Sequence, residues 1–349
     1  MSVIRLYPSG NEVPCPDGMT VLAALEAEGW ALPNNCRAGT CGECKVKVRS
    51  GSFDQGFVLD MALSKEDREQ GYGAMCMAKP LSEYLEIEWG TEDAKPTLFP
   101  PREQIAYVVV ERIERTPSII ELRLRPIGES LRFWPGQHMQ LGAPPEHPLR
   151  NYSMADAPRP DGELTFYITR EPFGQTSSWL TDSVAIGETL MVNGPYGSFI
   201  GDPAIATPVL LLAGGSGLAP IMSLTEAALR RGFAHPVTLV FSVRTPADVY
   251  PLGQLEYLKR RYPNFELQVS YTRHDHGKTC TAEPHHHGRI PEILETITPS
   301  LAGTAVFIAG SDHFVSDCAR VVNSLGPGMV YTEPFTDQQG DFFSLSILG

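Results

Sequence analysis

The first part of the chain mixes strand-like and helix-like patterns of apolar positions. Residues 3–7 form a short apolar run, and residues 84–89 alternate apolar with acidic side chains, as a half-buried strand does. Residues 20–28 carry apolar side chains at helical spacing behind Thr20, a residue type that caps helices. These patterns predict a small α+β domain over residues 1–95.

The middle of the chain has a different pattern. Residues 96–102 are rich in proline and show no periodicity, so we expect a linker there. Short apolar runs separated by glycine, proline and aspartate turns then predict an antiparallel β-barrel domain over residues 103–204. These runs occupy residues 105–110, 119–124, 164–169 and 189–192.

In the last part, residues 205–349, buried apolar runs alternate with helical segments. Strands that alternate with helices form a parallel sheet covered on both faces, so an α/β domain is expected. The runs occupy residues 209–213, 237–243, 265–271, 305–309 and 329–331.

Composition and charge narrow the function. The 349 residues hold 28 Lys and Arg against 41 Asp and Glu, a formal charge of −13, which argues against a nucleic-acid partner. No apolar run approaches the roughly 18 residues of a membrane span, and the start lacks the apolar stretch of a signal peptide. We therefore expect a cytoplasmic protein with no membrane partner, in which the seven cysteines are metal ligands or buried thiols rather than disulfides.

Four cysteines have a spacing that indicates a metal centre. Three follow the pattern C-x4-C-x2-C and the fourth lies further along, an arrangement typical of plant-type 2Fe–2S clusters. Gly39 and Gly42 allow the sharp bend that brings three thiolates onto one cluster. A structural zinc ion usually has paired C-x2-C ligands, so this spacing fits zinc poorly. The expected ligands are Cys36, Cys41, Cys44 and Cys76.

Two short motifs inside the predicted barrel offer groups that suit a flat, phosphorylated ligand. Residues 150–153 read Arg-Asn-Tyr-Ser, and residues 174–180 begin with glycine at a turn into a predicted helix. Together they supply a guanidinium for a diphosphate, an aromatic ring for a heterocycle, a hydroxyl for its edge and a helix N-terminus for an anion. Each motif alone also suits ordinary barrel surface.

A glycine-rich loop opens the third domain. Residues 214–220 read Gly-Gly-Ser-Gly-Leu-Ala-Pro and lie between the expected strand 209–213 and the helical segment 221–229. Glycines in a strand-loop-helix unit let a diphosphate approach backbone amides at the helix N-terminus. The spacing is not G-x-G-x-x-G, so the ordinary dinucleotide fingerprint is not met.

The order and context of these motifs resemble the ferredoxin–NADP reductase superfamily, in which R-x-Y-S and G-x-x-S-x-x-L are flavin motifs. The resemblance implies that Arg150, Gly174 and Ser177 hold the FAD diphosphate. It also implies that Tyr152 stacks on the isoalloxazine and that Ser153 sits near its reactive nitrogen.

The same resemblance implies a nucleotide site in the third domain. Arg244 would reach the adenosine half of the nucleotide, unless it is a solvated arginine, and Phe335 would cover the flavin, unless it is a core aromatic. Ala309 stands where the superfamily has a cysteine beside the nicotinamide, so the chain departs from the pattern there. The glycines implied to receive NAD(P)H are Gly214, Gly215 and Gly217.

Taken in order, iron–sulfur, flavin and nucleotide motifs resemble the reductase components of bacterial multicomponent Rieske or diiron oxygenases. The resemblance implies a β-grasp ferredoxin domain, and a path from NADH through FAD and the cluster to a terminal oxygenase component in aromatic hydrocarbon catabolism. The protein would contribute placement rather than acid–base chemistry, so no catalytic residue is expected. A reductase for a deoxysugar dehydrase, a redox-sensing iron–sulfur flavoprotein and a preference for NADPH stay open.

The charge of the first domain suggests how it meets a partner. Residues 1–95 carry 9 basic and 15 acidic side chains, 9 − 15 = −6. Such a surface could dock on a basic patch of the oxygenase, or it could be an ordinary solvated surface.

Overall fold

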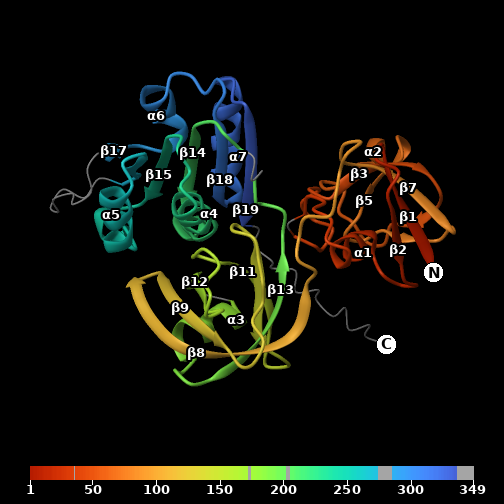
Figure 1. Ribbon diagram of the computed structural model, residues 1–349, viewed down its shortest axis with the longest axis horizontal. Coiled ribbons are helices and arrows are strands. Elements are labelled where there is room, and N and C mark those ends of the chain that lie inside the picture. The colour runs from red at the N-terminus through yellow and green to blue at the C-terminus, as the bar shows by residue number, and fades with distance from the viewer. Residues whose placement is uncertain (35, 172–173, 202–204, 274–284, 336–349) are drawn as a thin grey trace, which may run out of the picture.

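The computed structural model describes residues 1–34, 36–171, 174–201, 205–273 and 285–335, which form three large sheets and a two-stranded one (Figure 1). None of the helices in these ranges combines the length and apolar character that crossing a bilayer requires. Each large sheet encloses its own apolar cluster, as expected for a multidomain chain.

The N-terminal sheet has the strand order β2-β1-β7-β3-β5, with β1 parallel to β7. Helix α1 begins behind Thr20, whose hydroxyl accepts a hydrogen bond from the Ala23 amide at 3.3 Å, so the predicted cap is confirmed. The large elements are β1 (Ser2–Tyr7), β2 (Glu12–Cys15), α1 (Val21–Ala27), β3 (Lys45–Ser50), β5 (Tyr72–Ala74) and β7 (Tyr84–Glu88). Smaller ones are β4 (Phe53–Asp54), α2 (Lys65–Glu69) and β6 (Lys79–Pro80).

The middle sheet is antiparallel throughout and curls into the predicted barrel (Figure 1). Its strand order is β11-β10-β13-β8-β9-β12, and a bridge between Met154 and Phe166 links the two edges. The strands are β8 (Arg102–Thr116), β9 (Ile119–Pro126), β10 (His138–Ala143), β11 (His147–Ser153), β12 (Leu164–Thr169) and β13 (Thr189–Tyr196). Helix α3 (Gln175–Ser178) and a π-helical turn (Trp179–Ser183) follow β12.

The C-terminal sheet is parallel, as predicted, with the order β17-β16-β15-β14-β18-β19. Its strands are β14 (Val209–Gly214), β15 (Val237–Val243), β16 (Phe265–Tyr271), β17 (His285–His287), β18 (Ala305–Ser311) and β19 (Met329–Phe335). The helices are α4 (Leu218–Arg230), α5 (Leu252–Arg261), α6 (Ile290–Ile297) and α7 (Asp312–Ser324). The order reverses between β14 and β18, so the glycine-rich loop after β14 lies at a topological switch point, where such sheets bind ligands.

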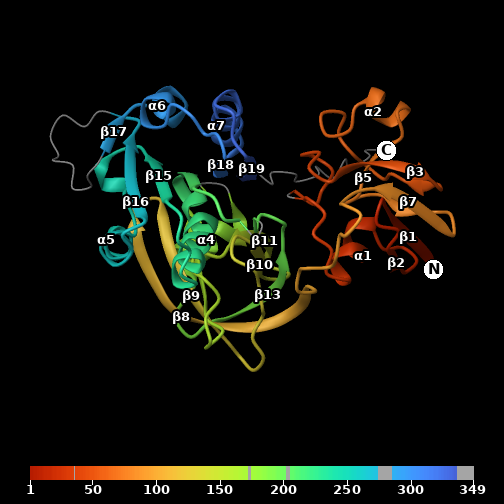
Figure 2. The same cartoon turned by 45° about the horizontal axis from the view of Figure 1, so that its top comes forward.

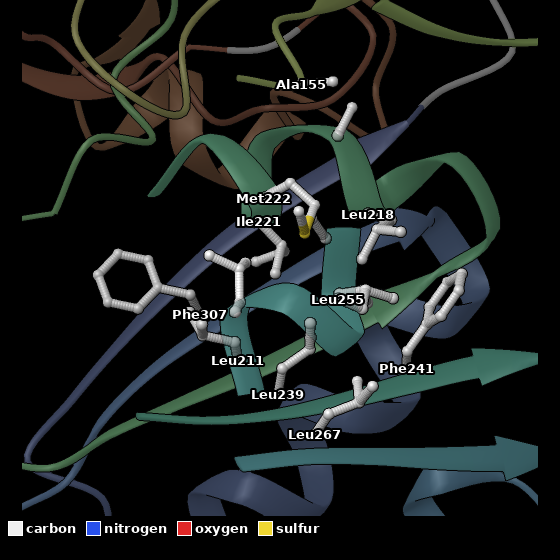
Figure 3. Packing of buried hydrophobic residues seen from close by; sticks show 14 of the residues in the cluster. Ala155, Leu211, Leu218, Ile221, Met222, Leu239, Phe241, Leu255, Leu267 and Phe307 are labelled. Carbon is white, nitrogen blue, oxygen red and sulfur yellow. The ribbon is translucent and has the colours of Figure 1, made fainter. Parts of the chain in front are cut away.

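Alternate side chains of β14 pack on opposite faces of this sheet. Leu211 joins the cluster under α4 and α5, whereas Leu212 joins the cluster under α6 and α7. Figure 3 shows the first of these clusters, which includes Met222 of α4 and Ala155 of the barrel. The barrel and the parallel sheet therefore share a continuous apolar core.

The connection between the first two domains is held at both ends. The Gly29 carbonyl accepts hydrogen bonds from the amides of Thr97 and Leu98 at 2.8 and 2.9 Å. On the barrel side, Trp134 donates to the Thr97 carbonyl at 2.8 Å and stacks on Phe99 with ring centres 5.6 Å apart. Both views place the N-terminal domain beside the other two (Figure 1, Figure 2).

Candidate functional site

The four spaced cysteines lie together at one end of the N-terminal domain. Three of them are buried, and Cys41 is half-buried. Their thiols make contact one after another, from Cys41 to Cys36, from Cys36 to Cys76 and from Cys76 to Cys44. Within the described ranges, no three His, Cys, Asp or Glu side chains gather around a single point as ligands of one metal ion would. Four neighbouring cysteine thiols, three of them with the C-x4-C-x2-C spacing, match the four thiolate ligands that a two-iron cluster needs.

Backbone amides surround these sulfurs. The Cys36 sulfur accepts from the amides of Ala38 and Thr40 at 3.4 and 3.3 Å, and the Cys44 sulfur accepts from the Cys76 amide at 3.4 Å. Hydrogen bonds from the Cys41 and Cys76 thiols lower the pKa of Cys36, and the amides act in the same direction. Such donors stabilise thiolates and the added electron of an iron–sulfur cluster.

The bend of this loop depends on the two predicted glycines. Gly39 and Gly42 have φ of +72° and +80°, in the left-handed region. A Cβ on Gly39 would lie 2.8 Å from the Phe57 carbonyl oxygen, and one on Gly42 would lie 2.9 Å from that of Ala62. Both positions therefore require glycine for conformation and for space.

The candidate flavin residues lie on β11 and on the turn that packs against it. The Thr176 hydroxyl donates to the Pro148 carbonyl at 2.5 Å, which ties α3 to β11. Arg150 donates to the neighbouring Leu149 carbonyl at 3.0 Å, and in the described part of the chain no carboxylate pairs with it. Burial raises the pKa of Tyr152, whose ring is half-buried, so its hydroxyl stays neutral. An uncommitted guanidinium beside an aromatic ring suits a flavin diphosphate.

The turn itself is tightly folded. Ser177 is buried and its hydroxyl donates to the Gly174 carbonyl at 3.3 Å. A Cβ on Gly174 would lie 2.0 Å from the Ser177 hydroxyl oxygen, so any other residue there would force this hydroxyl to move. The structure thus brings both predicted segments to one end of the barrel.

The glycine-rich loop packs closely on the neighbouring strand. A Cβ on Gly217 would lie 2.2 Å from the carbonyl oxygen of Ala309, whereas the space next to Gly215 is open within 4 Å. Across the domain boundary, the Thr169 hydroxyl donates to Ser216 at 2.8 Å. The loop between Gly214 and Gly217 is therefore placed between β18 and the barrel, with open space next to Gly215.

The other two candidates for this site lie at the same edge of the sheet. Arg244 directly follows β15 and is exposed, and Phe335 ends β19 in a half-buried position. The family cysteine is replaced by Ala309, which is completely buried in β18.

The structure also shows a row of polar side chains, on neighbouring strands of the barrel, that the sequence patterns did not indicate. On the curled sheet His138 of β10 is in register with Ser153 of β11 and with Tyr196 of β13. His138 and Glu333 are both buried, and His138 Nδ1 lies 3.7 Å from Glu333 Oε1. The Nε2 atom of His138 is buried without a hydrogen-bond partner in the described residues. A buried orphan donor or acceptor beside Ser153 fits a polar ligand such as a flavin edge.

The cluster loop rests on this row. The guanidinium of Arg37 lies 4.3 Å from the ring centre of Tyr196, and it also pairs with Glu26 at 2.5 Å. Glu43, between two of the cysteines, has a raised pKa, because it is desolvated and because the charge of Glu333 acts on it. A histidine or arginine in isolation carries no sequence signal for such long-range contacts, so these residues could be found only in the folded chain.

The three sites together define a flavin-dependent oxidoreductase with its own iron–sulfur domain, and comparisons with known proteins agree. Family models match a 2Fe-2S iron-sulfur cluster binding domain at residues 4–81, an oxidoreductase FAD-binding domain at residues 106–200 and an oxidoreductase NAD-binding domain at residues 211–320. The three expected cofactors, a 2Fe–2S cluster, FAD and NADH, are confirmed by these matches.

Relatives extend the likeness over almost the whole chain. The reductase subunit of an aromatic O-demethylase from Amycolatopsis sp. is 36% identical, over 94% of this chain and 97% of the relative. The toluate 1,2-dioxygenase electron transfer component of Pseudomonas putida is 30% identical, over 91% and 93%. The crystal structure of the Amycolatopsis cytochrome P450 reductase GcoB matches with a TM-score of 0.84 and 28% identity, over 96% and 99%. The chain belongs to the family of iron–sulfur flavoprotein reductases that are the electron-transfer components of oxygenase systems.

Proposed function

We propose that this chain carries electrons from NADH, through FAD and a 2Fe–2S cluster, to the terminal component of an oxygenase that acts on aromatic compounds. The observation that carries the proposal is the contact of the cluster loop with the barrel. Arg37 follows a cluster cysteine directly and lies on Tyr196, which adjoins the row of His138 and Ser153. A cluster and a flavin bound at these places would be neighbours.

The cluster ligands are assigned to the four cysteines. Their sulfurs form a continuous row of contacts, and three of the four cysteines are buried. Amide donors toward two sulfurs favour the thiolate forms that bind iron. The ligand set is Cys36, Cys41, Cys44 and Cys76.

The nucleotide ligands are assigned in the same way. Arg150 would hold the FAD diphosphate with the turn at Gly174 and Ser177, Tyr152 would lie on the isoalloxazine, and Ser153 with His138 would face its polar edge. The open side of the glycine-rich loop would take NADH. The other residues assigned to nucleotide and flavin binding are Gly214, Gly215, Gly217, Arg244 and Phe335.

The chemistry of the bound groups explains the three-part design. When bound, FAD would supply a site for the electron pair of a hydride and the cluster would supply one-electron transfer, so that NADH could serve a one-electron acceptor. The chain orients these groups. Gly217 lets the loop lie against β18, Thr169 holds the same loop to the barrel through Ser216, and Arg37 holds the cluster loop to the other side of the barrel.

The acceptor class can be proposed from the relatives. The O-demethylase reductase subunit and the P450 reductase structure both cover nearly the whole chain, which favours a cytochrome P450 as the terminal oxygenase. A Rieske-type dioxygenase is the second candidate, because the toluate dioxygenase component is also similar over nine-tenths of the chain. These relatives favour an oxygenase over a deoxysugar dehydrase. We also infer a cytoplasmic location, where NADH is present and thiols stay reduced.

An anaerobic stopped-flow experiment with NADH tests the order of transfer. We expect flavin absorbance to fall first and the electron paramagnetic resonance signal of the reduced cluster to follow. A purified cytochrome P450 and a purified Rieske oxygenase, offered in turn, then identify the acceptor. A cluster that is reduced before the flavin, or a purified protein that binds neither iron nor FAD, would refute the proposal.

A further inference from the structure

Three consecutive residues of the glycine-rich loop after β14 are each held by a different part of the chain. The Tyr250 hydroxyl donates to the Gly215 carbonyl at 2.9 Å. Thr169 of the barrel donates to Ser216 at 2.8 Å, and Gly217 packs against β18 without space for a Cβ. Of the three contacts, the one from Tyr250 acts on a backbone carbonyl of the loop, so it fixes the direction of a peptide group.

Tyr250 is buried where the barrel meets the parallel sheet. It is 2% exposed, and its ring packs edge-on against Tyr167 of β12 and Phe241 of β15, with ring centres 5.1 and 5.7 Å apart. Edge-on aromatic pairs at this spacing are favourable. All three rings belong to the cluster of Figure 3. Because one neighbouring ring comes from each domain, both domains set the position from which the hydroxyl reaches the loop.

The hydroxyl of Tyr250 is a permanent donor. Burial raises the pKa of Tyr250, so the hydroxyl keeps its proton at neutral pH. Its acceptor, the Gly215 carbonyl, also accepts from the Leu218 amide in the turn that leads into α4. Two donors, one from the turn and one from outside it, therefore direct this carbonyl toward the helix.

The direction of the Gly215 carbonyl decides which groups the loop presents to a ligand. In a helical turn the amides point toward the N-terminus and the carbonyls toward the C-terminus. Gly215 has a φ of +56°, and in the described ranges no heavy atom lies within 4 Å of a Cβ built on it, so packing does not fix its backbone. If this peptide group turned over, its oxygen would face a diphosphate and repel it.

We propose that Tyr250 is a positioning residue for the coenzyme, which holds the Gly215 peptide group so that the loop presents amides to the diphosphate of NADH. Tyr250 acts through the loop and not by contact with the coenzyme. This inference rests on the proposed function for the identity of the ligand as NADH. It also implies that the loop takes its binding conformation only while the barrel and the parallel sheet are packed together, because the ring of Tyr250 is held by both.

Two variants that each lose one buried tyrosine hydroxyl test this role in the holoprotein. Tyr250→Phe keeps the packed ring and removes the donor to Gly215. Tyr107→Phe is the matched control, because the Tyr107 hydroxyl is also buried and bonds to a backbone group, the Leu131 amide at 2.9 Å, inside the barrel. Calorimetric titration with NAD⁺ gives the Kd of the coenzyme without turnover, and ferricyanide reduction gives kcat and the KM for NADH.

We expect Tyr250→Phe to raise the Kd of NAD⁺ and the KM for NADH by about 2- to 10-fold, because one neutral hydrogen bond is lost. The value of kcat should stay near that of wild type, since the lost contact affects binding of the coenzyme. Tyr107→Phe should lower the melting temperature and leave Kd, KM and kcat at the wild-type values.

Hydrogen exchange followed by mass spectrometry adds a readout on the loop itself. Without coenzyme, the amides of residues 215–219 should exchange faster in Tyr250→Phe than in wild type or in Tyr107→Phe. Unchanged Kd and KM in Tyr250→Phe would overturn the proposal, and so would a rise in Kd that Tyr107→Phe shares, because lost stability would then explain it. A wild-type protein that neither binds NAD⁺ nor oxidises NADH would refute the proposed function instead.

Discussion

A buried carboxyl at the boundary between the barrel and the parallel sheet gives a prediction with a definite sign. Asp156 is 7% exposed and accepts hydrogen bonds from the hydroxyl and the amide of Thr165 at 2.9 and 3.3 Å. It lines a small cavity together with Glu226 of α4. Burial, and to a lesser degree the charge of Glu226, raises the pKa of Asp156 to about 7. The folded protein therefore keeps this proton at pH values where the unfolded chain has released it.

The pH dependence follows from this difference. An ordinary aspartate has a pKa of 3.8, so between pH 4 and 7 the folded state binds more protons and its stability falls as the pH rises. At 1.36 kcal/mol for each pKa unit, the loss above pH 7 is at most about 4 kcal/mol. An asparagine side chain in the same place does not ionise. We therefore expect the Asp156→Asn variant to match wild type near pH 4.5 and to exceed its stability at pH 8.

The measurement is urea unfolding of the holoprotein, followed by the fluorescence of released flavin, at several pH values from 4.5 to 8. Asp161→Asn is the matched control, because two hydrogen bonds from Arg159 lower the pKa of Asp161 to about 2, below the range of the experiment. The difference between this control and wild type should stay constant with pH. A constant difference for Asp156→Asn as well would refute the reasoning.

Three further predictions concern the electron path and the nucleotide loop. Cys76→Ser should abolish the cluster signal in paramagnetic resonance while NADH still bleaches the flavin, and cluster reduction in this variant would contradict the ligand assignment. Tyr196→Leu removes a cation–π contact of about 0.5–2 kcal/mol, so flavin-to-cluster transfer in stopped flow should slow by about 2- to 30-fold. Arg49→Ala, which loses a similar contact inside the first domain, should leave that rate unchanged. Gly217→Ala should raise the KM for NADH and lower the melting temperature, because its Cβ would lie 2.2 Å from a carbonyl oxygen, whereas Gly253→Ala, in open space on α5, should not destabilise.

Local signals in the sequence were enough for the fold class and for the spacing of the cysteines. Gly39 indicated a bend because glycine adopts the left-handed backbone conformation more easily than other residues do. The structure has a φ of +72° there. The alternation at residues 84–89 became β7 (Tyr84–Glu88), a strand of the first sheet. The parallel sheet was evident because its strands are buried on both faces and read as continuous apolar runs.

Other elements gave no such signal. Strand β10 was not predicted, because its apolar positions are few and are interrupted by Gln140 and Gly142, and β17 was not predicted because it consists of three histidines at a sheet edge. The pairing of His138 with Glu333 joins residues that are remote in the sequence, across two domains. Arg37 looked like an ordinary loop arginine, and only the folded arrangement places it on Tyr196. Contacts of this kind depend on the tertiary fold and have no local pattern.

The held connection between the first two domains limits how this protein can be rebuilt. Trp134 and Phe99 stack on each other, and two amides of the same segment bind the Gly29 carbonyl. A ferredoxin domain transplanted from a relative would therefore need a linker that makes the same contacts, together with an aromatic residue on the barrel for that linker to stack on. A chimera that joined the modules with a flexible spacer would contain the same domains, yet their relative position would vary. Its two redox groups would have to come together by diffusion in every turnover.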